Sequence, residues 1–122
     1  MSKRVLLVED EPNIVEAIRF VLSRAGFAVD THSDGRSAFD AVKDRAPDVV
    51  ILDVMLPGRS GYDILQDLRA EAQTSDVPVL MLTARGQRKD EEMAARFGAS
   101  KFMTKPFANA ELLDAVRALA GA

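Results

Sequence analysis

Short runs of apolar residues recur along the chain, and most of them stop at a charged or hydroxyl-bearing residue. The runs are Val5–Val8, residues 48–53, residues 77–82 and, less apolar, residues 100–104. Residues 27–31 alternate apolar and polar positions instead, which is typical of an edge strand. Continuous Val, Ile and Leu is typical of parallel strands that are buried on both faces. The pattern therefore predicts five strands, with residues 48–53 near the centre of the sheet.

The segments between these strands have apolar residues at helical spacing. Pro12 suits the first turn of the first helix, and Gly26 is placed to end it. Pro47 stops the second helix, Ser60 is a plausible N-cap for the third, and Asn109 can cap the last. The expected buried stripes are Ile14, Ile18, Val21, Leu22 and Ala25; Ala38, Phe39, Val42 and Ala46; Ile64, Leu65 and Leu68; and Leu112, Leu113, Val116 and Leu119.

The helix expected over residues 86–97 is polar through its first half. It offers little apolar surface for burial, so we expect it to be the least stable helix. Its charge run from Arg88 to Glu92 is interpreted as a solvated face, with a partner-recognition surface as the sharper hypothesis. Gly98 closes the helix.

Five strands that alternate with five helices predict an α/β fold with a doubly wound parallel sheet. We expect the flavodoxin-like (βα)5 arrangement with strand order 2-1-3-4-5, because the second and fifth strands are the least apolar and suit the edges. The 122 residues fit one domain, residues 1–122. A stand-alone domain is favoured, although a domain cut from a longer regulator has the same pattern.

Composition and charge exclude several classes of protein. The chain has no cysteine, so it has neither a disulfide framework nor a thiolate metal site. No apolar run approaches the roughly 20 residues of a membrane span, and the N-terminal apolar stretch is too short for a signal peptide. The net charge of -3 argues against direct nucleic-acid binding. We expect a cytoplasmic protein.

Chemically active side chains follow four of the five strands. They are Glu9 with Asp10, then Asp53, Thr83 and Lys105, and parallel strands place all of these ends at one edge. Three crowded carboxylates repel one another and need a cation. Oxygen ligands of this kind favour Mg²⁺. A metal ion, a lysine and a hydroxyl donor around a carboxylate suit phosphoryl transfer, in which aspartate is a known acceptor.

The strand ends also carry motifs of a known family. The motifs are Val8-Glu9-Asp10-Glu11, Leu52-Asp53-Val54-Met55-Leu56-Pro57 with Gly58 and Gly61, Leu82-Thr83-Ala84, and Lys105-Pro106-Phe107. Each is weak alone, but together and in order they are specific. Over roughly residues 3–120 the chain resembles a response-regulator receiver domain of bacterial two-component signalling.

The resemblance implies that Asp53 accepts a phosphoryl group from the phosphohistidine of a sensor histidine kinase or histidine phosphotransfer protein, or slowly from a small phosphodonor. It implies Mg²⁺ binding by Asp10, Asp53 and the backbone carbonyl of Met55, with Glu9 acting mainly through a metal-bound water. The protein would then be a phosphorylation-controlled signalling switch that catalyses its own phosphorylation and dephosphorylation, and not a turnover enzyme.

Further roles follow from the resemblance. Lys105 would pair with the phosphoryl group, and the Lys105–Pro106 bond would be cis. Thr83 would hydrogen-bond a phosphoryl oxygen, and Phe102 occupies the switch-aromatic position. The moving part would comprise the loop after Thr83, the helix expected over residues 86–97, the strand over residues 100–104 and the last helix. A plainer interpretation of Phe102 is that it is a static core aromatic. The plainer interpretation of Asp10 is a favourable negative charge at the N-terminus of a helix.

Other positions bear on lifetime and assembly. By resemblance, Met55 and Arg85 sit where the family tunes access of water to the acyl-phosphate. Ser100 and Lys101 stand where dimerising, DNA-binding members usually have acidic residues, so we expect a monomer or weak dimer. The output partner cannot be named. His32, the only histidine, is interpreted as solvated and distant from the acidic edge.

Two other functions share these parts. The first is an Mg²⁺-dependent phosphatase or phosphotransferase with an aspartyl nucleophile, which usually needs a second Asp two residues later; Met55 stands there and cannot transfer protons. The second is a flavin mononucleotide module of the flavodoxin type. Its phosphate loop would follow the first strand, where Glu9-Asp10-Glu11 would repel phosphate.

Overall fold

The computed structural model describes residues 2–84 and 88–121, and these form ten regular elements. The strands are β1 (Arg4–Val8), β2 (Ala28–His32), β3 (Val49–Asp53), β4 (Val79–Thr83) and β5 (Lys101–Thr104). The helices are α1 (Pro12–Arg24), α2 (Ala38–Arg45), α3 (Gly61–Ala70), α4 (Arg88–Arg96) and α5 (Asn109–Ala120). All strand pairings are parallel and the order is β2-β1-β3-β4-β5. The predicted flavodoxin-like fold is therefore confirmed.

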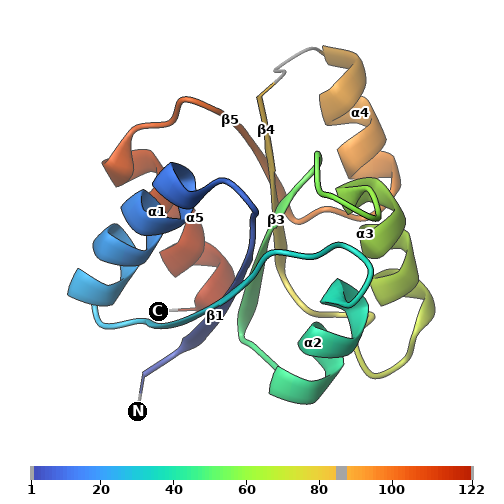
Figure 1. The fold of residues 1–122 in the computed structure, drawn as a ribbon, viewed down its shortest axis with the longest axis horizontal. Coiled ribbons are helices and arrows are strands. Elements are labelled where there is room, and N and C mark those ends of the chain that lie inside the picture. The colour runs from blue at the N-terminus through green and yellow to red at the C-terminus, as the bar shows by residue number, and fades with distance from the viewer. Residues whose placement is uncertain (1, 85–87, 122) are drawn as a thin grey trace.

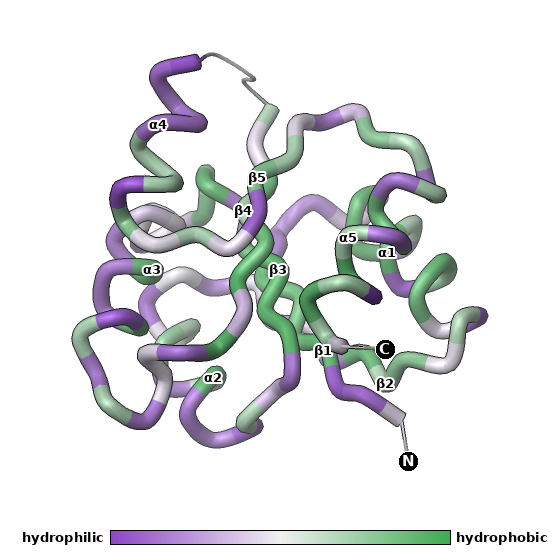
Figure 2. The backbone as a smooth tube through the Cα atoms, turned by 180° about the vertical axis from the view of Figure 1, so that it is seen from behind, coloured by the Kyte–Doolittle hydropathy of each residue, from purple (hydrophilic) through white to green (hydrophobic). Residues whose placement is uncertain are grey.

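Helices cover both faces of the sheet, with α1 and α5 on one side and α2, α3 and α4 on the other (Figure 1). Successive side chains of a strand point to opposite faces, so each central strand supplies both cores. In β3, Val49 and Ile51 join the core beneath α1 and α5, whereas Val50 and Leu52 join the other core. Figure 2 shows the result as hydrophobic central strands flanked by helices in which hydrophobic and hydrophilic positions alternate.

The predicted helix boundaries are mostly confirmed. Pro12 is the first residue of α1, and Gly26 follows the helix with a φ of 97° that favours glycine. Ser60 is the N-cap of α3, and its Oγ accepts a hydrogen bond from the Asp63 N–H at 3.3 Å. The prediction for Asn109 was wrong. Ala108 occupies the N-cap of α5 without a side-chain hydrogen bond, and Asn109 is already helical.

The helices differ in how much they bury. Four residues of α5 and four of α3 are buried, but only Ala94 is buried in α4. The predicted start of this helix at Gly86 lies outside the described residues, and its low stability stays a prediction. Within residues 2–84 and 88–121, no helix combines the length and apolar character that crossing a membrane requires.

Candidate functional site

The parallel register aligns the carboxyl ends of the central strands. Val8 pairs with Leu52, Asp53 with Leu82, and Thr83 with Thr104. The residues that end or follow these strands are consequently neighbours in space although they are far apart in sequence. The sheet thus brings Glu9, Asp10, Asp53, Thr83 and Lys105 to one edge, where the sequence predicted them.

Three carboxylates meet at this edge. Glu9, Asp10 and Asp53 each offer an oxygen, and these oxygens all lie within 4.8 Å of one another. Glu9 is 1% exposed and Asp53 is 4% exposed, while Asp10 faces solvent. Two negative charges are therefore withdrawn from water and one stays accessible, which is an arrangement that a cation can enter from the outside.

Lys105 is the cation nearest to this acidic group among the described residues. Its Nζ lies 2.6 Å from Glu9 Oε1 and 3.5 Å from Asp53 Oδ2. The backbone N–H of Lys105 donates to the Thr83 carbonyl at 2.8 Å, which fixes the residue beside β4. The Lys105–Pro106 peptide bond is cis. One lysine against three carboxylates leaves an excess of negative charge.

The protonation of Asp53 reflects this crowding. Burial, followed by the charge of Glu9, raises the pKa of the Asp53 carboxyl to about 7, even though Lys105 acts in the opposite direction. The Met55 N–H donates to Asp53 Oδ1 at 3.3 Å and also favours the ionised form. Asp53 is thus poised to gain or lose a proton near neutral pH, and a bound cation would favour the ionised carboxylate.

Glu9 has a structural role that the sequence did not reveal. Its Oε2 accepts hydrogen bonds from the N–H groups of Asp10 and Glu11 at 3.1 and 3.2 Å, while its Oε1 pairs with Lys105. Burial alone would lower the pKa of Lys105, but the hydrogen bond to Glu9 and the charges of Asp53, Glu9 and Glu11 together raise it. Glu9 therefore holds Lys105 charged and in position.

The chemistry of the donor set suits a hard divalent cation. Carboxylate and carbonyl oxygens are the ligands that Mg²⁺ and Ca²⁺ take in proteins, and Mg²⁺ commonly binds through one or two carboxylates plus waters. A charge of two units would offset the excess of carboxylates over lysine. The described residues Glu9, Asp10 and Asp53 accordingly fit a metal ion.

The loop after β3 is packed tightly against the site. Gly61 N–H donates to the Val54 carbonyl at 2.8 Å, and a Cβ on Gly61 would collide with the Asp53 carbonyl oxygen. Beside this loop lies a cavity of about 620 Å³, lined by Val54, Met55, Ser60, Tyr62, Thr83, Ala84, Lys89, Asp90 and Met93. The cavity separates the end of β3 from the first half of α4.

Thr83 and Phe102 lie on neighbouring strands. Thr83 is 3% exposed at the end of β4. Phe102 is half-buried in β5, pairs in register with Met81, and packs against the core beneath α2, α3 and α4. The position of Phe102 does not show whether it switches, so its switching stays a prediction. Arg85, the second position assigned to water access, lies outside the described residues.

The prediction for His32 was wrong. It is half-buried, its carbonyl accepts the Glu9 N–H at 3.0 Å, and its Nε2 lies 2.7 Å from Ser37 Oγ. With Glu9 and Asp10 it lines a second cavity of about 290 Å³. The error arose because the end of β2 pairs directly with the end of β1, which brings an edge strand to the border of the site.

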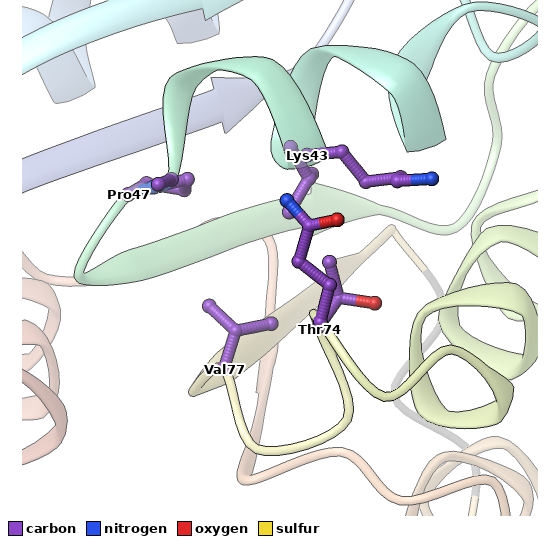
Figure 3. Close-up of a pocket in the computed structure, with 7 residues that line it drawn as sticks. Lys43, Pro47, Thr74 and Val77 are labelled. Atoms are coloured by element: carbon purple, nitrogen blue, oxygen red, sulfur yellow. The ribbon is translucent and has the colours of Figure 1, made fainter.

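A further pocket lies at the opposite end of the strands. It has a volume of about 120 Å³ and is lined by Val42, Lys43, Ala46, Pro47, Gln73, Thr74 and Val77, close to where β3 and β4 begin (Figure 3). Lys43 is the charged residue of this lining. This pocket therefore lacks the group of carboxylates that marks the carboxyl edge.

Comparison with known proteins agrees with this geometry. The family model for the response regulator receiver domain matches residues 5–117. The phosphate regulon transcriptional regulatory protein PhoB of Escherichia coli (strain K12) is 41% identical over 119 residues, which are 98% of this chain and 52% of PhoB. The chain thus spans about half the length of the curated relatives it matches.

Solved structures show the same arrangement. The receiver domain of sensor histidine kinase PA1611 from Pseudomonas aeruginosa PAO1, described with a magnesium ion coordinated in its active site cleft, is 30% identical over both full chains with a TM-score of 0.91. The BeF3-activated N-terminal receiver domain of RstA from Klebsiella pneumoniae is 28% identical, covers 98% of this chain and all of its own, and has a TM-score of 0.91.

A match over most of the chain, the same fold and an acidic edge that suits a metal ion all point to one conclusion. The chain belongs to the response regulator receiver domain family, whose members are phosphoacceptor signalling switches of two-component systems.

Proposed function

We propose that Asp53 is the residue that accepts the phosphoryl group, with Mg²⁺ as the cofactor. The observation that carries this is the position of its carboxylate, which is buried at the end of β3, 3.5 Å from Lys105 and beside the carboxylates of Glu9 and Asp10. Glu9 is also buried beside Lys105 and two carboxylates, but its oxygens are already engaged by Lys105 at 2.6 Å and by the N–H groups of Asp10 and Glu11, which leaves Asp53 as the more available acceptor. Asp10, Asp53 and the Met55 carbonyl would hold the ion, with Glu9 contributing through water.

In the proposed transfer, an oxygen of Asp53 forms a bond to phosphorus while the bond from phosphorus to the donor nitrogen of a phosphohistidine breaks. The imidazole leaves with the electron pair of that bond and takes up a proton. Bound Mg²⁺ would supply charge neutralisation for the phosphoryl oxygens. Lys105 is held charged by Glu9 at 2.6 Å and lies 3.5 Å from Asp53, so it can contact a phosphoryl oxygen on Asp53 while it keeps its pairing with Glu9.

The proposed switch follows from the change of charge at Asp53. A phosphoryl group adds close to two negative charges and three acceptor oxygens. The hydroxyl of Thr83 is a suitable donor for one of these oxygens, and Phe102 lies on the adjacent strand. Drawing Thr83 inward would displace the loop after β4 and shift the face formed by α4, β5 and α5, which is the part that partners would sense.

The partners are proposed by class. Receiver domains work with histidine kinases, so a sensor histidine kinase or a histidine phosphotransfer protein is the proposed phosphodonor. The output partner is unknown. PhoB is a transcriptional regulatory protein about twice as long as this chain, so a transcriptional output is one route, although this domain is not expected to bind nucleic acid itself. A turnover enzyme is disfavoured, because Met55 offers no general acid.

The assembly state is proposed to be a monomer or weak dimer. Ser100 uses its Oγ to accept the Val79 N–H at 3.0 Å, and Lys101 is exposed at the start of β5. Neither residue offers the acidic group that the dimerising members usually carry there.

The test uses beryllofluoride, a phosphoryl mimic, with Mg²⁺. We expect the amide spectrum from Thr83 through Lys105 to change in the wild type and to stay unchanged in Asp53→Asn. The matched control is Asp44→Asn, which alters an exposed carboxylate of α2 and should respond like the wild type. A wild-type spectrum that does not change would refute the switch, and a response that survives in Asp53→Asn would refute the assignment of the acceptor.

A further inference from the structure

The two ends of α4 are attached to the rest of the protein in different ways. Along the helix itself only Ala94 is buried, so its packing does little to fix its position. Its carboxyl end, however, runs into the corner of residues 97–100, where Phe97 and Ala99 pack against the core shared with α2 and α3. The attachment of this corner determines which parts of α4 are free to move.

Arg69, in the last turn of α3, is the side chain that reaches this corner. Its Nε donates to the Gly98 carbonyl at 2.9 Å. Its Nη1 donates to the carbonyls of Ser75 at 3.1 Å and Thr74 at 3.4 Å. Thr74 is 4% exposed and donates through its Oγ1 to the Leu68 carbonyl at 2.6 Å. One half-buried guanidinium therefore joins α3, the loop before β4 and the corner after α4.

The same corner is also fixed to the sheet. Ser100 N–H donates to the Val79 carbonyl at 2.9 Å, and the Val79 N–H donates in return to Ser100 Oγ at 3.0 Å. Gly98 has a φ of 97°, and a Cβ there would lie 3.1 Å from the Arg69 side chain. The backbone of this corner has little room to change without breaking these bonds.

The amino end of α4 has a weaker attachment. Tyr62 Oη donates to the Asp90 carbonyl at 3.3 Å, which is long for a hydroxyl donor. Tyr62 also meets the Phe97 ring edge-on, with centroids 5.9 Å apart. Between this end and the end of β3 lies the cavity of about 620 Å³, so the first turns of α4 face open volume and not a packed core.

We infer that Arg69 makes the carboxyl end of α4 a fixed pivot, so that the signal from Asp53 swings only the first half of the helix across this cavity. The inference rests on the proposed function, since it takes the shift of α4 as given and specifies its axis. Tyr62 is the releasable contact and Arg69 the permanent one. Both are positioning residues, because neither touches the acceptor carboxylate.

A consequence for the output follows. A partner that distinguishes the two states must contact the moving half of α4, where Arg88, Lys89, Glu91 and Glu92 are exposed. The exposed Arg96 and Lys101, near the pivot, would present the same surface in both states. The charge run that sequence analysis interpreted as a solvated face thereby becomes the part of the surface that reports phosphorylation.

The chain has no cysteine, so pairs of spin labels can be placed without background. One label goes on Asp44→Cys in α2 as the reference, and the second goes on either Lys89→Cys or Ala95→Cys, all at exposed positions. Electron–electron distance measurements are made with and without beryllofluoride and Mg²⁺. We expect the 44–89 distance distribution to shift and the 44–95 distribution to stay within its ligand-free width.

Two substitutions separate the pivot from general packing. Arg69→Met keeps the aliphatic stem but removes the donors, and we expect the 44–95 distance then to shift with the ligand as well. Arg69→Lys, which keeps one donor nitrogen in place of the planar guanidinium, should restore part of the restraint. Tyr62→Phe removes only the hydroxyl at the other end, so it should broaden the 44–89 distribution without ligand and leave 44–95 unchanged.

The outcomes distinguish the two proposals. Equal shifts of both label pairs in the wild type would overturn the pivot but leave the switch intact. A 44–95 distance that stays fixed when the ligand binds to folded Arg69→Met would also overturn the pivot alone. No shift of either pair would overturn the switch and the pivot with it. Without ligand, Arg69→Met should speed amide exchange at Gly98 and Ala99 by about tenfold and spare the first turn of α4; uniform acceleration would also contradict the pivot.

Discussion

In the central strands, the interior residues and the residues at the carboxyl end are almost equally buried, but burial has opposite energetic effects on them. Leu7, Ile51 and Leu80 are 0% exposed and are apolar, so their burial stabilises the fold. Glu9 and Asp53, at the carboxyl edge, are almost as buried but can carry charge, and withdrawing a charge from water costs free energy. The same sheet therefore stabilises the protein in its middle and holds a costly group at its edge.

Stability and signalling are therefore separable along a single strand. Three backbone N–H donors and one lysine at the edge only partly compensate the buried carboxylates, as the raised pKa of Asp53 indicates. A cation or a covalently attached group that changes this balance can therefore change the structure nearby. Substitutions in the interior should alter stability alone, and substitutions at the edge should alter response and stability in opposite directions.

The largest effect on stability is expected in the interior. Ile51→Ala should lower the free energy of unfolding by about 2–5 kcal/mol, because it removes buried apolar volume and leaves a cavity. Urea unfolding measures this change. Ile51→Val is the matched control and should cost only about 0.5–1.5 kcal/mol. The comparison would fail if folded Ile51→Ala lost its beryllofluoride response, since the interior would then take part in signalling.

The edge should behave in the opposite way. The Asp53 carboxyl binds its proton more tightly in the folded protein, where its pKa is about 7, than in the unfolded chain, where the pKa is about 4. The metal-free protein should therefore lose stability as the pH rises from about 4 to about 7 and level off above. Asp53→Asn, which resembles the neutral form, should be more stable than the wild type at pH 8 by about 2–4 kcal/mol, at about 1.4 kcal/mol per pKa unit.

Urea unfolding at pH 5 and pH 8 in the presence of a chelator measures this difference. The gap between the two proteins should narrow at pH 5, where the folded wild-type carboxyl is protonated, and should close only below about pH 4, where the carboxyl of the unfolded chain is protonated as well. Asp44→Asn, at an exposed position of α2, should follow the wild type at both values. A wild-type protein that gained stability between pH 5 and pH 8 relative to Asp53→Asn would contradict the assigned cost of the buried charge.

The sequence predicts those features of the structure that depend on the pattern of residue types along the chain, and not those that depend on which side chains meet. The strands of the interior were predicted because runs such as Val49–Leu52 suit burial on both faces. The edge was predicted because parallel strands place all their carboxyl ends together. The pairing of Glu9 with Lys105 could not be predicted, because the sequence shows that both residues reach the edge but not which carboxylate lies nearest to the lysine.

Other features left no signal in the sequence. Arg69 binds backbone carbonyls, and every residue has one, so nothing in the sequence of its partners marks the contact. His32 was misplaced because its contact with Glu9 also runs through the backbone. Asn109 was predicted as a cap from its side chain, but the helix starts one residue earlier than that role requires. Pairings through the main chain become visible only in the structure.

A divalent cation should have a smaller effect on the free energy of unfolding, and the effect should depend on the edge and not on the interior. A cation that binds the folded protein and not the unfolded chain stabilises it by RT ln(1 + [L]/Kd), which is about 1.4 kcal/mol at ten times Kd. We expect Mg²⁺ to raise the wild-type free energy of unfolding at pH 8 and to leave Asp53→Asn nearly unchanged. Ile51→Val should respond like the wild type, because its carboxylates are intact. A gain of equal size in Asp53→Asn would contradict Asp53 as a ligand.

The smallest effect is expected at the N-cap of α3, which lies next to the edge but holds none of its charge. Ser60→Ala removes the acceptor of the Asp63 N–H and should cost about 1 kcal/mol in urea unfolding. Because the cap acts on the helix and not on the carboxylates, the cost should be the same at pH 5 and pH 8 and with or without Mg²⁺. Ser60→Asn, which can cap in the same way, should recover most of the loss. A cost that appeared only with Mg²⁺ would instead mean that the loop from Asp53 to Ser60 reorganises around the ion, and the edge would then extend into α3.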